Sequence, residues 1–440
     1  MNHYCDGLKR RDLLRVGVLS AGFSALGSIS RTGLSVDAAE RLVATQGQGL
    51  TENKRAIFIE LPGGPSHLDS FDPKPDAPSE YRGKFNSIGT KIPGIRLSEH
   101  LPLLASRNDK FALMRGVSHT LAAHALGQEY VVTGSKPIAS LEYPTYGAVV
   151  DRLRQSVIDL PGQVSIPRSN HNAGFLGIAH SPLETNATPQ PGKPFSVRGV
   201  SLAGGIDLEL VAQRQRLLKN LDRRFDRLES DPTISGMDRF SDRAYDILTS
   251  QRTREAFDIS KEPAKFAEPF GESPFGQSCL LATRLIESGV NFVTIQFGGW
   301  DTHRDNFTQL SKKLPLLDQG VSALLDGLEQ RGLLDSTVVY MTGEFGRTPK
   351  INTKSAEGGR DHYPRCMTML MAGGGIEGGQ VIGESDATAS GPKNDPIKPD
   401  DVAASFYHAL GIDPLMEFHT PSGRPITLVR DGNVIEQLFA

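Results

Sequence analysis

The stretch that decides the fold is Thr337–Phe345, TVVYMTGEF, in which an apolar run ends in a glycine and an acidic residue. The same pattern occurs at Ala56–Gly64 (AIFIELPGG) and at Asn291–Asp301 (NFVTIQFGGWD). Short apolar runs bounded by glycine and proline are typical of buried strands. In an open α/β sheet, ligands bind in the crevice outside the carboxyl ends of the strands. Polar side chains at three such ends therefore predict one shared site.

A fourth apolar run, Phe111–Val117, also leads into polar residues, and a later glycine-rich loop at 358–362 adds an acid and a histidine. We take the polar side chains that follow the four runs, and those of the loop, as candidate site residues. In chain order they are Glu60, His67, Asp69, Ser118, His119, Thr120, His124, Asp301, His303, Glu344, Arg347, Asp361 and His362.

Helical patterns alternate with the apolar runs in the second half of the chain. Helices are expected at 278–288 and 312–330, on either side of the strand at 291–297. Such alternation predicts an α/β fold, a three-layer α/β/α sandwich with a largely parallel central sheet. A helical insertion or cap is expected at about 155–275, and an edge strand at 427–430.

The N-terminus reads as a targeting segment. Arg10 and Arg11 precede a short, weakly apolar run, as in a twin-arginine export signal, which we place at 1–39 with a linker at 40–54. The alternative is a basic amphipathic helix on a membrane surface. The run is too short to span a membrane, so no integral span is expected once the signal is removed. The protein is therefore expected to be periplasmic or extracellular.

Charge and cysteine usage exclude two classes of protein. The formal net charge of −3 gives no basic stripe for nucleic acid. Cys5 lies in the expected signal, and Cys279 and Cys366 belong to no CxxC or Cys/His pattern, so a thiolate zinc site is not expected. Buried free thiols are expected, although an oxidising compartment would permit one disulfide.

The residue types at the strand ends suit a divalent cation. Asp301 and His303 stand two residues apart, so in an extended loop both side chains face the same way. Carboxylate and imidazole ligands without thiolate suit Zn²⁺, Mn²⁺, Mg²⁺ or Ca²⁺. Arg347 could hold an oxyanion, because a guanidinium binds phosphate or sulfate oxygens bidentately. The alternatives are a hydrogen-bonded loop pair at Asp301 and His303 and an internal salt bridge between Glu344 and Arg347.

Four phrases of the sequence resemble the DUF1501 family. They are LPGGPSHLDSFDP at 61–73, WDTH at 300–303, GEFGRTP at 343–349 and GRDH at 359–362. That family resembles a sulfatase-like branch of the alkaline phosphatase superfamily. The resemblance implies an alkaline phosphatase-like fold over 55–440 and a site that holds divalent metal.

The resemblance also implies roles for single residues. Asp301 and His303 resemble the first Asp-and-His ligand pair, and His362 resembles the late histidine ligand. Glu344 resembles the acid of the second pair, but Phe345 stands where the histidine of that pair is expected. Near the first strand, the alternatives for a further ligand are Glu60, His67 and Asp69.

The nucleophile and the activity also follow from the resemblance. Ser118 or Thr120 resembles the superfamily nucleophile, activated by metal; the alternative is that they cap a helix. No Cys-x-Pro-x-Arg occurs, which disfavours a formylglycine-type sulfatase. The expected function is an exported, metal-dependent hydrolase of sulfate or phosphate esters, acting on a small-molecule or glycan substrate. The alternative is a catalytically silent member that binds glycans or a partner protein, and the oligomeric state stays open.

Overall fold

The structure is a computed structural model that describes residues 54–154, 156–157, 159–193, 195–197, 200, 213 and 244–440. The expected signal at 1–39 and nearly all of the expected linker lie outside these residues. Among the helices that the structure does describe, each is too short or too polar to cross a bilayer.

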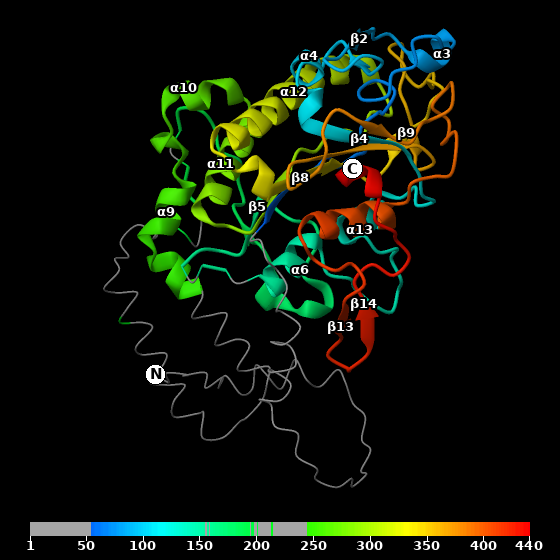
Figure 1. The fold of residues 1–440 in the computed structure, drawn as a ribbon. Coiled ribbons are helices and arrows are strands. Elements are labelled where there is room, and N and C mark those ends of the chain that lie inside the picture. Colours follow the sequence, from blue (N-terminus) through cyan, green and yellow to red (C-terminus); the bar gives the residue numbers. More distant parts are fainter. Residues whose placement is uncertain are drawn as a thin grey trace, which may run out of the picture. The chain divides into compact units, whose positions relative to one another are not determined.

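The centre of the fold is an eight-stranded sheet in the order β12-β4-β11-β8-β1-β7-β5-β6 (Figure 1). Every neighbouring pair is parallel except the two that β11 makes, with β4 and with β8. The strands of this sheet are β1 (Arg55–Glu60), β4 (Phe111–Val117), β5 (Gln163–Ile166), β6 (Leu183–Glu184), β7 (Phe292–Gln296), β8 (Thr337–Thr342), β11 (Met367–Ala372) and β12 (Val381–Ile382). The predicted α/β fold with a largely parallel sheet is confirmed.

Alternate side chains of the strands pack into two separate cores, one on each face of the sheet. In β1, Ile57 and Ile59 face the core formed with α4, α11 and α12, whereas Ala56 and Phe58 face the core formed with α5, α6 and α13. The sheet is thus the middle layer of a three-layer sandwich (Figure 1). The helices are α3 (Ser79–Arg82), α4 (Pro102–Ala105), α5 (His124–Thr133), α6 (Tyr146–Leu153), α9 (Gln251–Phe257), α10 (Ala264–Ala267), α11 (Pro274–Ser288), α12 (Asn306–Gln330) and α13 (Pro399–Ala409).

Local signals in the sequence set the ends of the long helices. The Ser273 hydroxyl accepts a hydrogen bond from the Gly276 amide at the start of α11, and Pro274 takes the first helical position. Gly289 ends α11 with φ of 112°, a conformation that favours glycine. Gly134 ends α5 in the same left-handed region.

The strand register brings the polar loops to one edge of the sheet. Glu60, the last residue of β1, lies level with Gln296 at the end of β7 and Thr342 at the end of β8. The loops after these strands therefore leave the sheet together. β4 runs in the same direction, so the segment from Ser118 to α5 begins at the same edge.

Small two-stranded sheets complete the fold. β9 (Gly346–Arg347) pairs with β10 (His362–Tyr363) beside the loops just described, and β2 (Ser87–Gly89) pairs with β3 (Arg96–Ser98). β13 (Glu417–His419) pairs with β14 (Pro425–Thr427) as a separate hairpin.

Two expectations about the outer parts of the fold differ from the structure. The tail at 427–430 adds no edge strand to the large sheet, because only its first residue belongs to a strand, the short β14, which pairs with β13. The segment 155–275, expected as a helical insertion, contributes β5 and β6 to the sheet, since short strands of mixed residues carry a weak periodic signal. Cys279 and Cys366 are buried free thiols, as expected.

Candidate metal centre

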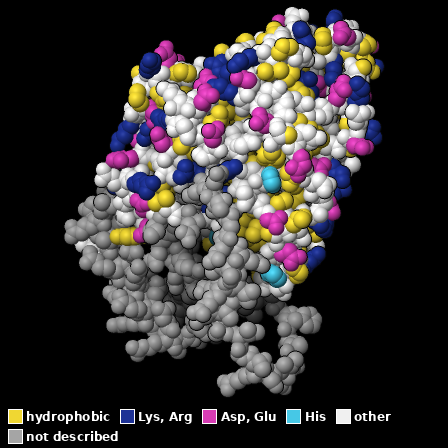
Figure 2. All heavy atoms as spheres, viewed as in Figure 1, with side chains coloured by type: hydrophobic (Ala, Val, Ile, Leu, Met, Phe, Trp, Pro, Cys, Tyr) yellow, Lys and Arg dark blue, Asp and Glu magenta, His cyan; other side chains and the backbone are white. Residues whose placement is uncertain are grey.

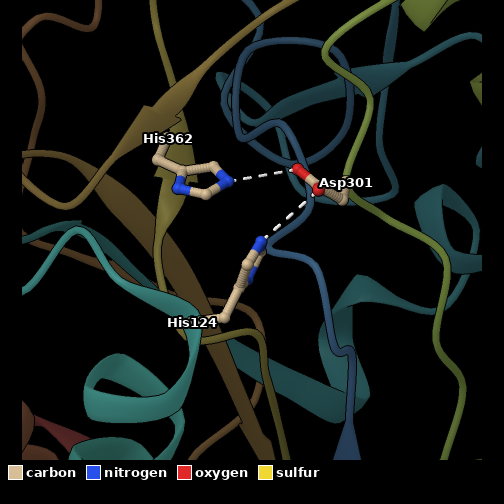
Figure 3. A group of neighbouring side chains, drawn as sticks. All are labelled: His124, Asp301 and His362. Carbon is tan, nitrogen blue, oxygen red and sulfur yellow. Dashed lines mark hydrogen bonds and ion pairs between the residues drawn. The ribbon is translucent and has the colours of Figure 1, made fainter.

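Three side chains from distant parts of the sequence meet at the carboxyl edge of the sheet (Figure 3). Asp301 lies in the loop after β7, His124 begins α5 and His362 lies on β10. The Asp301 carboxylate stands between the two imidazoles, with Oδ2 3.4 Å from His124 Nε2 and Oδ1 3.2 Å from His362 Nε2. The three potential ligand atoms all lie within 4.8 Å of one another. This arrangement can hold one cation.

A fourth side chain, His303, points to the same place. His303 Nε2 lies 3.0 Å from Asp301 Oδ1 and 3.0 Å from His362 Nε2. Two imidazole nitrogens at this distance need either a proton or a cation between them, because two lone pairs repel each other. His303 is therefore a possible fourth donor to the same centre.

Each of the three imidazoles is oriented through its other ring nitrogen. His124 Nδ1 lies 2.5 Å from Glu344 Oε1, and His303 Nδ1 lies 2.5 Å from Asp361 Oδ1. His362 Nδ1 lies 2.9 Å from the carbonyl oxygen of Ala122. Histidines that bind metal nearly always donate this second N–H to a carboxylate or a backbone carbonyl, which leaves Nε2 for the ion.

The spacing of the donor atoms also fits a metal ion. Ligands about 2.0–2.1 Å from a tetrahedral zinc ion stand about 3.3 Å apart. The separations from Asp301 to each imidazole and from His303 to His362 are 3.0–3.4 Å. Three imidazoles and one carboxylate form a donor set that suits zinc and similar transition metals better than the all-oxygen sets of calcium and magnesium.

The buried guanidinium of Arg347 holds the Asp301 carboxylate in place. Its Nη2 lies 2.7 Å from Asp301 Oδ1, and the guanidinium also donates to the carbonyl oxygens of Gly63, Gly64 and Arg360. Burial by itself raises the pKa of Asp301, but the hydrogen bond and charge of Arg347 outweigh it and lower that pKa. The carboxylate is thus held ionised, as a metal ligand must be. Arg347 is fully buried and donates to Asp301 and to three backbone carbonyls, so in this structure it supports the carboxylate; its expected role in holding an oxyanion stays a prediction.

His362 is held in the neutral form that a metal ligand needs. Burial lowers its pKa, and the nearby charges of Arg347 and His124 lower it further, although the hydrogen bond to Ala122 acts in the opposite direction. The neutral ring then offers the Nε2 lone pair to a cation.

Glu344 anchors this side of the site. The Gly63 amide donates to both of its carboxylate oxygens, at 2.9 and 3.1 Å, in addition to the contact with His124. His119 Nε2 donates to the Glu344 carbonyl oxygen at 2.8 Å, and His119 Nδ1 accepts from the Leu121 amide at 3.1 Å. Burial lowers the pKa of His119. Glu344 therefore orients His124, and His119 is a neutral part of the scaffold.

Phe345, which stands where the resemblance noted in the sequence implies a histidine ligand, forms an apolar wall. Its ring centroid lies 5.1 Å from that of His124 and 4.6 Å from that of His362. An aromatic wall excludes water from one side of the imidazoles and strengthens the electrostatic interactions there.

The three candidates near the first strand are held elsewhere. The Asp69 carboxylate receives hydrogen bonds from Ser66, Asn306 and Arg360, and the ion pair with Arg360 is completely buried. His67 Nε2 lies 3.0 Å from the Ala389 carbonyl oxygen, and burial lowers the pKa of its ring. Neither side chain is part of the group around Asp301.

Glu60 is a buried carboxyl at the end of β1. Its Oε2 lies 3.3 Å from Gln296 Nε2, and its Oε1 has no hydrogen-bond partner among the described residues. Burial raises the pKa of Glu60 to about 7, and the charge of Glu344 acts in the same direction. Glu60 is therefore close enough to Glu344 to interact electrostatically, but it does not contact the three imidazoles.

The expected nucleophiles lie on the loop between β4 and α5. Ser118 is half-buried and Thr120 is exposed. Helix α5 begins later, with Ala123 as its N-cap and no capping side chain, so the alternative that these residues cap the helix is wrong. Their loop leads into α5, whose first residue is His124.

Several supporting groups carried no signal in the sequence. The Gly63 amide, the Ala122 carbonyl and Lys354, whose Nζ lies 2.6 Å from Asp361 Oδ1, are backbone or long-range partners. Only the glycine repeat at Gly63 hinted at a special backbone: a Cβ there would come within 2.5 Å of the Asp301 nitrogen. That close approach explains why this turn needs glycine.

The chain has weak structural similarity to several solved proteins. A sulfatase, PsFucS1 from Pseudoalteromonas sp., is 10% identical with a TM-score of 0.41, over 91% of this chain and 74% of the other. The lipoteichoic acid synthase LtaP from Listeria monocytogenes is 11% identical with a TM-score of 0.37, over 87% and 76%. An alkaline phosphatase superfamily protein from Vibrio parahaemolyticus is 11% identical with a TM-score of 0.33, over 83% and 68%. At these scores the fold assignment rests on the strand order above.

Sequence comparison is decisive at the level of the family. No curated protein matches the chain. The family described as "Protein of unknown function (DUF1501)" matches residues 53–439, which include all four phrases noted in the sequence and the whole candidate metal centre. The chain therefore belongs to the DUF1501 family.

Proposed function

We propose that the protein is a metal-dependent hydrolase of sulfate or phosphate esters. The observation that carries this proposal is the convergence of three imidazole Nε2 atoms on one carboxylate, with each Nδ1 fixed by a second partner. Imidazoles whose second ring nitrogen is held in this way are typical of metal-binding histidines. The donors are partly exposed, with 36% of the His124 side chain and 42% of the Asp301 side chain accessible, so a substrate can reach them.

The residues divide into ligands and supports. His124, Asp301 and His362 would hold the ion. His303 would either be a fourth metal ligand or face the substrate. A divalent cation in this place would polarise the ester and lower the pKa of the attacking oxygen. We retain Ser118 and Thr120 as candidate sources of that oxygen, because their loop leads directly to His124.

The first experiment combines metal analysis with hydrolysis. Purified protein is loaded with Zn²⁺, Mn²⁺, Mg²⁺ or Ca²⁺ and assayed on an aryl phosphate, a phosphodiester and an aryl sulfate. We expect about one tightly held transition-metal ion per chain and hydrolysis of at least one ester. His124→Ala should lose both the ion and the activity, whereas His419→Ala, at an exposed histidine on β13, should keep both. Failure of every metal to support turnover or ester binding would refute the proposal.

A second function is favoured by the third imidazole, that of His303. If His303 Nε2 occupies the last position of a tetrahedral site, the ion is closed off, as in structural zinc sites. The protein would then be a catalytically silent member that binds a glycan or a partner protein. One firmly held ion without turnover in the wild type, and no turnover in His303→Ala, is the result that selects this alternative.

We also propose export by the twin-arginine route, with residues 1–39 as signal and 40–54 as linker. The proposal rests on Arg10 and Arg11 ahead of a short, weakly apolar run. Replacement of both arginines by lysine should retain the full chain in the cytoplasm. Continued export of the doubly substituted chain would refute this route.

A further inference from the structure

A cavity lies beside the end of α5, whereas His124 of the metal centre lies at the start of that helix. It has a volume of about 470 Å³, which is within the usual range for small-molecule sites. Its walls come from the end of α5, from the loop that follows it and from the loop after β5. Polar side chains in its lining include Glu129, Thr133, Glu142, Asn170, His171 and Asn172.

The two faces of α5 serve different sites. His124 and Gly127 face inward: a Cβ at Gly127 would lie 3.3 Å from the Cβ of Glu344. Glu129 follows His124 by five residues, which turns it about 140° around the helix axis, and Thr133 lies one turn beyond Glu129 on the same side of the helix. The cavity therefore lies beside the end of α5, away from His124 at its start.

Two carboxylates face the cavity, and one of them lacks a partner. Glu142 accepts a hydrogen bond from Asn172 Nδ2 at 2.6 Å, whereas the Glu129 carboxylate has no hydrogen bond or ion pair within the described part of the chain. Burial raises the pKa of Glu129, and the charge of Glu142 raises it further. The described residues that line the cavity include neither lysine nor arginine. The cavity therefore favours a ligand that brings a positive charge.

His171 adds a second unsatisfied group. Its Nε2 is buried without a hydrogen-bond partner among the described residues, and burial lowers the pKa of the ring. Because this nitrogen is buried, the ring contributes to the cavity wall rather than a contact for a ligand. Asn170 offers an amide group at the same wall, whereas Asn172 is engaged, since its Nδ2 donates to Glu142 and its Oδ1 accepts from the Gly174 amide.

We propose that this cavity binds an amino-sugar unit of a glycan, with its ammonium group between Glu129 and Glu142 and a hydroxyl on Asn170. Carboxylate and amide groups together provide the acceptors and donors that a sugar with a free amine requires. A sulfate or phosphate group is excluded from this position, because two carboxylates repel an anion. The cavity is also far larger than a metal ion needs. The site is a binding site in its own right and does not depend on the proposed hydrolysis.

The test measures binding of a glucosamine oligomer to the full-length protein at near-neutral pH by titration calorimetry. The fully N-acetylated oligomer serves as the ligand control, since acetylation removes the charge and keeps the rings. We expect the free amine form to bind at least ten times more tightly than the acetylated form. Glu142→Gln, at an exposed position, and Glu129→Gln should each weaken binding at least tenfold.

Two protein controls keep the result specific. Glu272→Gln makes the same charge change at an exposed position outside the cavity and should bind as the wild type does. Asp301→Asn should also bind normally, since it alters only the metal centre. Equal affinity for the acetylated oligomer, or unchanged affinity in both Glu129→Gln and Glu142→Gln, overturns the proposal. Loss of binding in Asp301→Asn would place the sugar at the metal centre instead and overturn the separate site.

Discussion

Arg347 and Asp301 form an ion pair between a fully buried guanidinium and a carboxylate whose side chain is 42% exposed, with Nη2 2.7 Å from Oδ1. The arginine is fixed by three backbone carbonyls, so it acts as a rigid base for the one carboxylate that faces all three imidazoles. Metal affinity should therefore depend on a residue that does not itself touch the metal.

We expect Arg347→Lys to lower metal affinity by about 10–100-fold, the usual cost of losing a partner that orients a ligand. Lysine carries a point charge and cannot donate to Asp301 and to the Gly63 and Gly64 carbonyls in one plane. Competition with a chelating dye measures the affinity, and circular dichroism checks the fold. Arg430→Lys, which makes the same change at an exposed arginine paired with Asp431, serves as the control. Wild-type affinity in a folded Arg347→Lys protein would show that Asp301 needs no such support.

Metal should stabilise the folded protein. A ligand at 100 times its dissociation constant adds about 2.7 kcal/mol to the free energy of unfolding, provided that it does not bind the unfolded chain. Thermal unfolding with and without a chelator should therefore show a higher midpoint for the metal-loaded wild type. In Asp301→Asn the two curves should coincide, and in His419→Ala they should differ as in the wild type. A chelator effect that persists in Asp301→Asn would locate the ion elsewhere.

Glu60 should make stability fall as pH rises. Its folded-state pKa of about 7 lies above the ordinary value of 4.5, so the unfolded chain releases this proton first. The stabilising protonated form is fully present below the unfolded pKa, and its contribution is lost as pH rises through the folded pKa. The shift corresponds to roughly 3 kcal/mol.

The measurement is urea unfolding of metal-free wild type and Glu60→Gln at pH values below 4.5 and above 7. Glutamine does not titrate, so the variant should gain on the order of 3 kcal/mol relative to the wild type between the two conditions. If the stability difference between the two proteins is the same at both pH values, the raised pKa of Glu60 is wrong.

We expect Asp69 to contribute to the free energy of unfolding and not to metal binding. Asp69→Asn leaves the buried Arg360 guanidinium without its counter-charge, and breaking a buried pair in this way costs about 3–5 kcal/mol. Denaturant unfolding measures the loss, and elemental analysis of the folded fraction should show wild-type metal content. If the Asp69→Asn protein folds but contains no metal, Asp69 is a metal ligand and this prediction is wrong.

Much of the framework follows from local sequence. The runs Phe111–Val117 and Thr337–Thr342 form strands with the predicted bounds, because apolar periodicity and flanking turns are properties of a few neighbouring residues. The expected helix at 278–288 lies within α11, with its start set by the Ser273 cap. The prediction was less accurate where the sequence pattern is weak. The residues of β5 and β6 were expected in a helical insertion, but these two strands join the large sheet beside β7.

The sequence alone determined which strand ends carry polar groups and that carboxylate and imidazole donors gather at one edge of a parallel sheet. The tertiary structure decided which of these donors meet. His124 lies close to Asp301 and His362, and Asp69 forms a buried ion pair with Arg360. Arg347 is buried next to the Asp301 carboxylate and orients it. The physical reason is that strand formation depends on neighbouring residues, whereas the meeting of side chains depends on strand register, loop conformation and hydrogen bonds between distant segments.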